Sequence, residues 1–201
     1  GRANYWLGHY DEADRHQRSA LAHFEALGDR RGQAHAWLNL GRLAEFEHRI
    51  EDALAHTERG LVLFRAEGYR PGLAKALNGV GWYHCLLGDY QLALRYCGEA
   101  LVLLQELGDR RIEGNTWDSL GYAHHRAGDL DQAIDCYRQA LDLFRDIADP
   151  YNEAEVSLHL GDAYADAGDQ PSARTHWQRA LAIFQELGHP DAATVRARLA
   201  P

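Results

Sequence analysis

Apolar residues recur along this chain with the 3.6-residue period of amphipathic helices, and short polar turns separate the apolar stretches. The clearest example begins at Trp117. Leu120 and Gly121 follow it at i+3 and i+4, which places all three residues on the same helical face. Gly128-Asp129 then predicts a left-handed helix stop followed by a side-chain cap for the next helix. That helix continues the stripe at Ala133, Tyr137, Ala140, Leu141 and Phe144. The pattern therefore predicts two amphipathic helices joined by a tight turn.

This helix pair repeats along the chain with a step of 40 residues. Two kinds of small residue recur in register, at Gly1, Gly41, Gly81, Gly121 and Gly161 and at Ala13, Ala53, Ala93, Ala133 and Ala173. A glycine inside a helix costs roughly 1 kcal/mol relative to alanine, so its repetition needs a packing reason. We expect these glycines to let the two helices of each pair approach closely, with the recurring alanines as the matching small surface.

The repeat boundaries predict a single domain over residues 1–201. It comprises a partial first repeat at 1–28, full repeats at 29–68, 69–108, 109–148 and 149–188, and a truncated terminal helix at 190–201. Because both ends cut through helices and the chain contains no methionine, we expect a segment of a larger protein. The missing end caps would expose Trp6 and Leu7 at one end and Val195 and Leu199 at the other. A neighbouring domain, or a second copy in an end-to-end homodimer, would cover them.

The repeat resembles a known family. The columns Trp117-x-x-Leu120-Gly121-x-x-His124, then Ala133, Tyr137 and Ala140, resemble the tetratricopeptide repeat signature. Each repeat ends in a form of Leu-Gly-Asp, as at 107–109, where the family usually has proline. This variety resembles the repeats of Pins-type adaptors and of actinobacterial SARP-type and NTPase-containing transcriptional regulators. The resemblance covers the whole chain and implies an all-α fold, a right-handed α-solenoid of about five helix-turn-helix hairpins.

Amino-acid composition limits the cellular environment and the classes of binding partner that are expected. The formal charge of −9 argues against direct contact with nucleic acid, whose binding domains are usually basic. No apolar run approaches the roughly 18 residues that a membrane span needs. Cys85, Cys97 and Cys136 are odd in number and lack CxxC spacing, so they are interpreted as reduced thiols. We therefore predict a cytoplasmic protein without membrane contact.

The family resemblance also implies where a partner binds, because the first helices of tetratricopeptide pairs line a concave groove. Residues one turn apart on the face opposite the packing stripe should point into it. We predict a partner-binding site at Asn39, Arg42, Lys75, Asn78, Trp82, Asn115, Asp118, Ser119, Tyr122, His125, Arg126, His159 and Asp162. The same face also carries His35, Glu45, Cys85 and Glu155.

Two features of the surface keep alternative interpretations open. Exposed aromatic rings at Trp82 and Tyr122 would suit the capture of an extended peptide or a helix, but they would equally serve to cover the neighbouring helix. Five arginines share one turn of successive repeats: Arg30, Arg31, Arg70, Arg110 and Arg111. They either pair locally with residues such as Asp29 and Asp109 or form a docking edge for an acidic partner.

The candidate chemistry indicates binding rather than catalysis. His16, His56 and His176 share one column, but neighbouring repeats should hold them about 10 Å or more apart, too far to share a zinc ion. No elbow turn or oxyanion hole accompanies Ser119, and every glycine has a place in a helix stop or in helix packing. We therefore predict no enzyme activity, no catalytic residues, no cofactor and no metal site.

These observations predict a module that binds a protein or a peptide, which could be another domain of the same chain. The resemblance implies an interaction or sensor module of a larger bacterial transcriptional regulator. The alternative is a peptide-pheromone receptor or a scaffold domain, and an enzyme subunit is the remaining possibility. A winged-helix and NTPase region upstream would favour the regulator, and a short helix-turn-helix would favour the pheromone receptor.

Overall fold

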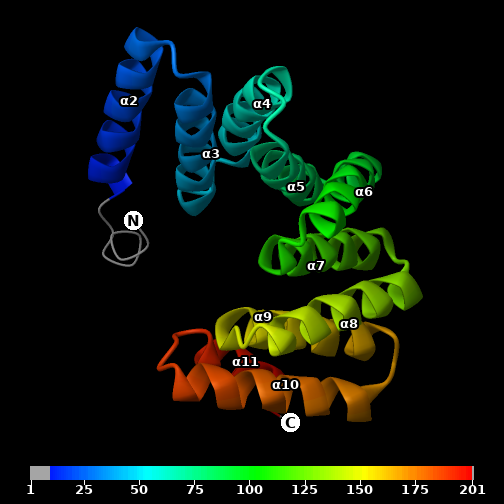
Figure 1. Cartoon of the computed structure of the whole chain (residues 1–201). Helices are drawn as coiled ribbons and strands as arrows, with labels where there is room; N and C mark the ends of the chain where they lie inside the picture. Colours follow the sequence, from blue (N-terminus) through cyan, green and yellow to red (C-terminus); the bar gives the residue numbers. More distant parts are fainter. Residues whose placement is uncertain (1–9, 201) are drawn as a thin grey trace. The chain divides into compact units, whose positions relative to one another are not determined.

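The computed structural model describes residues 10–200, which form ten α-helices (Figure 1). They are α2 (Tyr10–Leu27), α3 (Arg30–Phe46), α4 (Ile50–Ala66), α5 (Arg70–Leu86), α6 (Tyr90–Leu107), α7 (Arg110–Ala127), α8 (Leu130–Asp146), α9 (Pro150–Asp166), α10 (Gln170–Glu186) and α11 (Ala192–Leu199). These spans agree with the helices that the apolar periodicity predicts. The partial helix expected before residue 9, with Trp6 and Leu7, lies outside the described residues.

The chain divides into two compact units, the first ending at Leu103 and the second beginning at Leu104, within α6. In the first unit α3 packs against α2 and α4, and α4 packs against α5. In the second unit the order is α7 against α8, α8 against α9, α9 against α10, and α10 against α11. Each helix thus packs mainly on its neighbour in sequence. The all-α architecture of sequential hairpins, a tetratricopeptide-like solenoid, is confirmed.

The recurring glycines lie where the two helices of a pair come closest. A Cβ atom at Gly121 would lie 2.6 Å from Cδ1 of Tyr137, and one at Gly161 would lie 2.5 Å from Cδ1 of Trp177. Both distances are too short for any carbon contact, so the predicted close approach is confirmed. The surface that was expected to face these glycines in the second helix is corrected in part. In the second unit the glycines face an aromatic ring 16 positions later, and not the alanines at 133 and 173.

The turns between the helices follow the glycine-aspartate signal, with one correction. Gly128 takes the left-handed conformation at φ 86°, and Asp109, Asp149 and Asp169 accept backbone N–H hydrogen bonds at the starts of their helices. Asp129 was predicted to do the same, but its side chain makes no cap hydrogen bond. Its carboxylate instead lies 3.2 Å from Nδ1 of His124 in the preceding helix, which competes for it.

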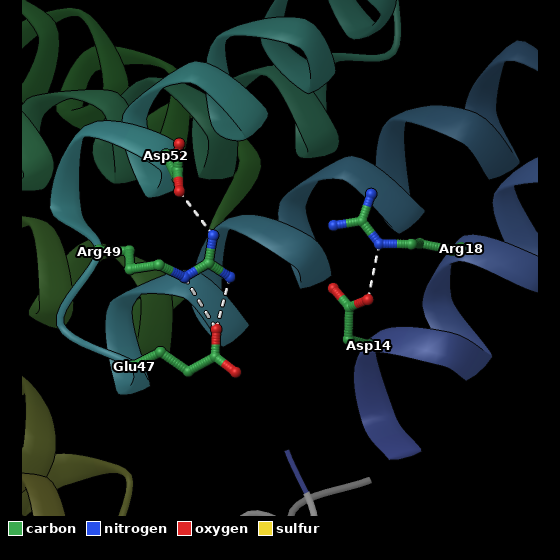
Figure 2. A network of polar contacts seen from close by, with 5 residues as sticks. All are labelled: Asp14, Arg18, Glu47, Arg49 and Asp52. Atoms are coloured by element: carbon green, nitrogen blue, oxygen red, sulfur yellow. Dashed lines mark hydrogen bonds and ion pairs between the residues drawn. The ribbon is translucent and has the colours of Figure 1, made fainter. Parts of the chain in front are cut away.

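The turn between α3 and α4 replaces glycine-aspartate with His48-Arg49 (Figure 2). His48 takes φ 58°, a conformation that usually favours glycine. Arg49 cannot cap α4 as a carboxylate does. Its guanidinium instead bridges the side chains of Glu47 and Asp52, with Nε 3.0 Å from Glu47 Oε2. A charge bridge therefore braces the turn in place of the missing cap.

Ala148, at the turn between α8 and α9, is the other non-glycine residue with positive φ among the described residues, at 52°. Replacing Ala148 with glycine should raise the free energy of unfolding by roughly 0.5–1 kcal/mol, because the left-handed strain on Cβ exceeds the added flexibility of the unfolded chain. Urea unfolding followed by circular dichroism measures the change. The reciprocal Gly128→Ala variant should lower the same free energy, and a stabilised Gly128→Ala would contradict the reasoning.

The C-terminal end of the second unit is better covered than the sequence predicts. Val195 was expected to be exposed at an open end, but its side chain is fully buried. It packs into a cluster with Ala173, Trp177 and Phe184, and Leu199 packs partly buried against the same cluster. α11 therefore acts as the cap. Val195 is therefore not part of an exposed surface for the predicted end-to-end pairing.

The arginines at the repeat turns pair with acidic groups, although not with the predicted ones. Arg110 donates to Asp146 at 2.8 Å, and Arg111 lies 2.7 Å from the buried Asp149. In the first unit Arg30 lies 3.7 Å from Glu67. Asp146 is the last residue of the following helix, whereas Asp149 and Glu67 lie in the turns that follow such a helix, and none of the partners is Asp29 or Asp109. These contacts favour the local-pairing interpretation over a docking edge.

Candidate functional site

A pocket of about 600 Å³ opens in the second unit between α7, α9 and the helices that follow. Its walls are Tyr122, His125, Arg126, Tyr137, Leu158, His159, Asp162, Ala165, Asp166, Trp177 and Arg198. The first helices of two successive pairs supply most of these residues, because positions three and four apart on α7 and on α9 face the same side. The second helices contribute Tyr137 and Trp177, whose rings reach the pocket beside Gly121 and Gly161.

An ion pair between Asp118 and His159 joins α7 to α9 beside the pocket. Nδ1 of His159 lies 2.8 Å from Oδ1 of Asp118, and the two side chains are only 26% and 20% exposed. Burial alone would lower the pKa of His159, but the charge and hydrogen bond of Asp118 outweigh it and raise that pKa to about 9. His159 is therefore a cation at neutral pH, and it donates its proton to the Asp118 carboxylate.

Glu155 lies one turn before His159 on α9, and the pKa of its carboxyl group is raised. Burial, together with the negative charge of Asp118, raises its pKa to about 7. The hydroxyl of Tyr151 donates to its carboxylate at 2.9 Å, which lowers the pKa but does not reverse the shift. Glu155 is consequently half protonated near neutral pH. A titratable group poised in this way is a common property of binding and functional sites.

Asp162 is the anchor of the C-terminal side of the pocket. Its carboxylate accepts two hydrogen bonds from Arg198 of α11, from Nε at 2.6 Å and from a terminal nitrogen at 2.8 Å. The indole N–H of Trp177 donates to the same carboxylate at 2.9 Å. Farther along, Nε2 of His125 lies 2.9 Å from Oδ2 of Asp166. Polar pairs therefore join α7 to α9 and α9 to α11 around the pocket.

Six of the predicted site residues lie around this pocket, whereas Asn115 and Ser119 of α7 do not. The six are Asp118, Tyr122, His125, Arg126, His159 and Asp162, of which all but Asp118 line its wall. Ser119 is only 6% exposed, and its hydroxyl donates to the carbonyl of Asn115 within α7. Neither Asn115 nor Ser119 lines the pocket.

The predicted residues of the first unit make contacts of their own. The indole N–H of Trp82 donates to Glu45 at 2.7 Å, and the ring packs against a cluster that includes Ala44 and Ala53. This arrangement fits the interpretation in which Trp82 covers the neighbouring helix. Asn39 donates to Gln17 at 3.3 Å, and the thiol of Cys97 lies 3.7 Å from Oδ1 of Asn78. Lys75 is exposed and Arg42 is half-buried. The role of the five predicted first-unit residues in binding a partner stays a prediction; they are Asn39, Arg42, Lys75, Asn78 and Trp82.

Sequence reasoning missed two residues that shape the pocket. Arg198 lies two 40-residue steps after Asp118, so the repeat register alone could have placed it on the same face. Trp177 lies one step after Tyr137, in a column that the periodicity assigned to the core. Its ring is indeed 7% exposed, yet its N–H reaches Asp162 at the pocket wall. A core position can therefore present one polar atom to a site.

Other kinds of site find little support in the part of the chain that the structure describes. Between residues 10 and 200 no three histidine, cysteine, aspartate or glutamate side chains are grouped so that they could hold a metal ion. The same residues include no helix with the length and apolar character needed to cross a membrane. Burial raises the pKa of the Cys136 thiol to about 11 and raises that of Cys97 further, so neither is a reactive thiolate.

The family model for tetratricopeptide repeats matches residues 72–146, the stretch from α5 to the end of α8, and the rest of the described chain continues the same hairpin architecture. The chain is therefore a helical-repeat protein with a tetratricopeptide-like fold. No curated protein matches the sequence significantly.

Solved structures share the fold at low sequence identity. BtubC (BKLC) from P. vanneervenii is 23% identical with a TM-score of 0.76, over 92% of this chain and 77% of its own. A Rap protein complexed with competence and sporulation factor is 16% identical with a TM-score of 0.74, over 82% of this chain and 46% of its own. A putative kinesin light chain from Podosopora anserina, with nearly identical TPR-like repeats, is 13% identical with a TM-score of 0.67, over 92% of both chains. At these identities the likeness extends to the fold alone.

Proposed function

We propose that this chain binds a segment of a partner protein in the pocket between α7, α9, α10 and α11. The observation that carries the proposal is the convergence of Tyr122, His125, Arg126, His159 and Asp162 on one cavity of about 600 Å³. Aromatic rings beside charged groups provide both the apolar contact and the directional hydrogen bonds that hold an extended peptide or a helix. A cavity of this size accepts a few side chains of such a segment.

We further propose that the module belongs to a larger bacterial transcriptional regulator, in which the bound partner would be an effector protein or another domain of the same chain. This part rests on the arginine-rich repeats ending in Leu-Gly-Asp, which resemble those of actinobacterial regulators. The sequence neighbouring this segment tests it. An upstream winged-helix and NTPase region supports the regulator, and its absence from the full-length protein would contradict it.

A second candidate is a receptor for a small signalling molecule such as a peptide pheromone. The observation that favours it is the similarity to a Rap protein that was solved in complex with competence and sporulation factor. The two candidates differ in the size of the ligand. A receptor of this kind would retain a small heat-stable ligand from culture medium, whereas the interaction module would retain a protein from the cell extract.

Replacing Tyr122 with alanine should release the partner without unfolding the domain. Tyr122 is half-buried at the pocket wall, where one side of its ring packs on the core cluster of α8 and α9 and the ring lies 5.8 Å from that of His159. Its removal takes away contact area from a ligand in the pocket. We expect at least a tenfold loss of partner in a pull-down from the native cell extract. Such a loss corresponds to about 1.4 kcal/mol of binding free energy.

The matched control is Tyr96→Ala, which removes a half-buried tyrosine that stacks on His84 in the first unit, outside the pocket. This variant should keep the partner, and circular dichroism should show unchanged helix content for Tyr122→Ala. Equal retention of the partner by wild type and Tyr122→Ala would place the binding site elsewhere and overturn the proposal.

A further inference from the structure

Arg198 is bound in the pocket as an arginine from a partner would be. Its planar guanidinium faces the Asp162 carboxylate with two parallel hydrogen bonds, of 2.6 and 2.8 Å. This fork-to-fork geometry is the strongest common form of charge-assisted hydrogen bonding in proteins. Arg198 is nevertheless a residue of the short terminal helix α11 and not of the helices that build the rest of the wall.

Asp162 is held in place independently of Arg198. The indole N–H of Trp177, a ring only 7% exposed, donates to Oδ1 of Asp162 at 2.9 Å. Trp177 is itself fixed against Gly161 by the close approach of α9 and α10. The carboxylate would therefore keep its orientation if Arg198 moved away. A preoriented carboxylate on a rigid wall is what a receptor for guanidinium needs.

The charges around the pocket favour a cation in the place of Arg198. The carboxylates of Asp162 and Asp166 line the pocket. Asp166 lies 2.9 Å from His125, whereas Asp162 forms its ion pair with Arg198. If Arg198 moved away, the two oxygens of Asp162 would be presented to another positive side chain. An incoming positive side chain would be attracted, and an incoming carboxylate would be repelled.

α11 does not depend on Arg198 for its place. Val195 is fully buried in the cluster around Trp177 and Phe184, and Arg174 donates to the carbonyl of Leu199 at 3.2 Å. The Arg198 side chain remains 36% exposed, so solvent and ligands reach it. Its ion pair can therefore open while the helix stays docked.

We propose that the pocket recognises an arginine side chain of the partner segment, and that Arg198 occupies this place while no partner is bound. The inference rests on the proposed function, since it names the chemistry of the ligand at the same site. Arginine fits better than lysine because a point-like ammonium cannot use both carboxylate oxygens of Asp162 in the same plane. Partner binding then replaces the guanidinium of Arg198 with that of the partner. The apparent affinity for the partner is the intrinsic affinity multiplied by the fraction of time in which Arg198 leaves Asp162 free.

The test uses N-acetyl-arginine N-methylamide as the probe and the indole N–H resonance of Trp177 as the reporter. That N–H is bonded to Asp162, so its chemical shift in a nitrogen-15-labelled protein follows events at this carboxylate. The resonance is assigned by its loss in Trp177→Phe. Probe affinity is compared between wild type, Arg198→Gln and Arg196→Gln, whose arginine is exposed on the same helix but does not line the pocket.

Arg198→Gln should bind the arginine probe about tenfold more tightly than both wild type and Arg196→Gln. Arg198→Lys keeps the positive charge but not the planar guanidinium, and its affinity for the probe should lie between those of wild type and Arg198→Gln. Because lysine keeps a long charged side chain on α11, this variant also controls for a loss of α11 in Arg198→Gln. Adding Asp162→Asn to Arg198→Gln should abolish binding. Equal affinity of Arg198→Gln and Arg196→Gln would overturn the inference, as would tighter binding of N-acetyl-glutamate N-methylamide.

The two proposals can fail separately. A partner that is captured by wild type and lost in Tyr122→Ala, combined with no gain for the arginine probe in Arg198→Gln, overturns the arginine site and leaves the binding function standing. A gain for the probe combined with a partner retained by Tyr122→Ala supports the arginine site and overturns its use for that partner.

Discussion

Leucine in place of Gly121 should lower the free energy of unfolding by about 3 kcal/mol, the upper end of the cost of overpacking a core. Even a Cβ atom at this position would lie 2.6 Å from the ring of Tyr137, which is fully buried. Tyr137 belongs to the cluster that joins α8 to α9, so its ring cannot move aside without disturbing that packing. Urea unfolding followed by circular dichroism would measure the loss.

Gly98 provides the matched control for this substitution. It also lies inside a helix, α6, but a Cβ atom there would meet nothing within 4 Å. Gly98→Leu should therefore stabilise the protein by up to about 1 kcal/mol, the difference in helix propensity between the two residues. If both variants shifted the unfolding midpoint in the same direction, the close helix approach at Gly121 would not explain its glycine.

The stability of the protein should fall by up to about 3 kcal/mol as the pH rises from 6.5 to 9, because of His159. The pKa of His159 is about 9 in the folded state, against a usual value of 6.5, since Asp118 stabilises the imidazolium. A group whose pKa is raised on folding contributes its full stabilisation below its unfolded pKa. That contribution is lost as the pH rises through the folded pKa.

Glu155 acts in the same direction at lower pH. Its folded pKa of about 7 lies above its usual value of 4.5, so the folded state holds a proton that the unfolded state releases between these values. The contribution of Glu155 to stability should accordingly decline as the pH rises through that range. The two groups make the second unit most stable on the acidic side of neutrality.

Urea unfolding at several pH values, for wild type and His159→Gln, would measure this dependence. The variant should lose most of the decline between pH 6.5 and 9. His16→Gln is the control, because that histidine is 73% exposed and its partner Glu12 is also exposed, at 54%. A wild-type stability that stayed constant over this range would contradict the charged Asp118–His159 pair.

Much of the fold could be predicted because its signals are local. The apolar period of each helix and the glycine-aspartate turns depend on residues within a few positions of each other, and the 40-residue step multiplies the same signal along the chain. The exceptions have local causes as well. Asp129 leaves its cap position because His124, five residues earlier, offers its carboxylate a closer partner.

The candidate site could be predicted only in part. The register placed Tyr122, His125 and His159 on a common side of their helices, and all three line the pocket, because the face of a residue follows from its position in a helix. It could not distinguish Ser119, whose hydroxyl turns back to the carbonyl of Asn115, from a residue that faces a ligand. That choice is made by the rotamer and by the packing of the neighbouring helix.

The sequence by itself determined the helices, most of their turns and the close approach of paired helices at the recurring glycines. These follow from periods and propensities that act within one repeat. Only the tertiary structure decided that Val195 of α11 is buried against α10, that Trp177 reaches from the core to Asp162, and that Arg198 completes the pocket wall. Each of these contacts joins residues from different helices, and their formation depends on the distances and angles at which the packed helices meet.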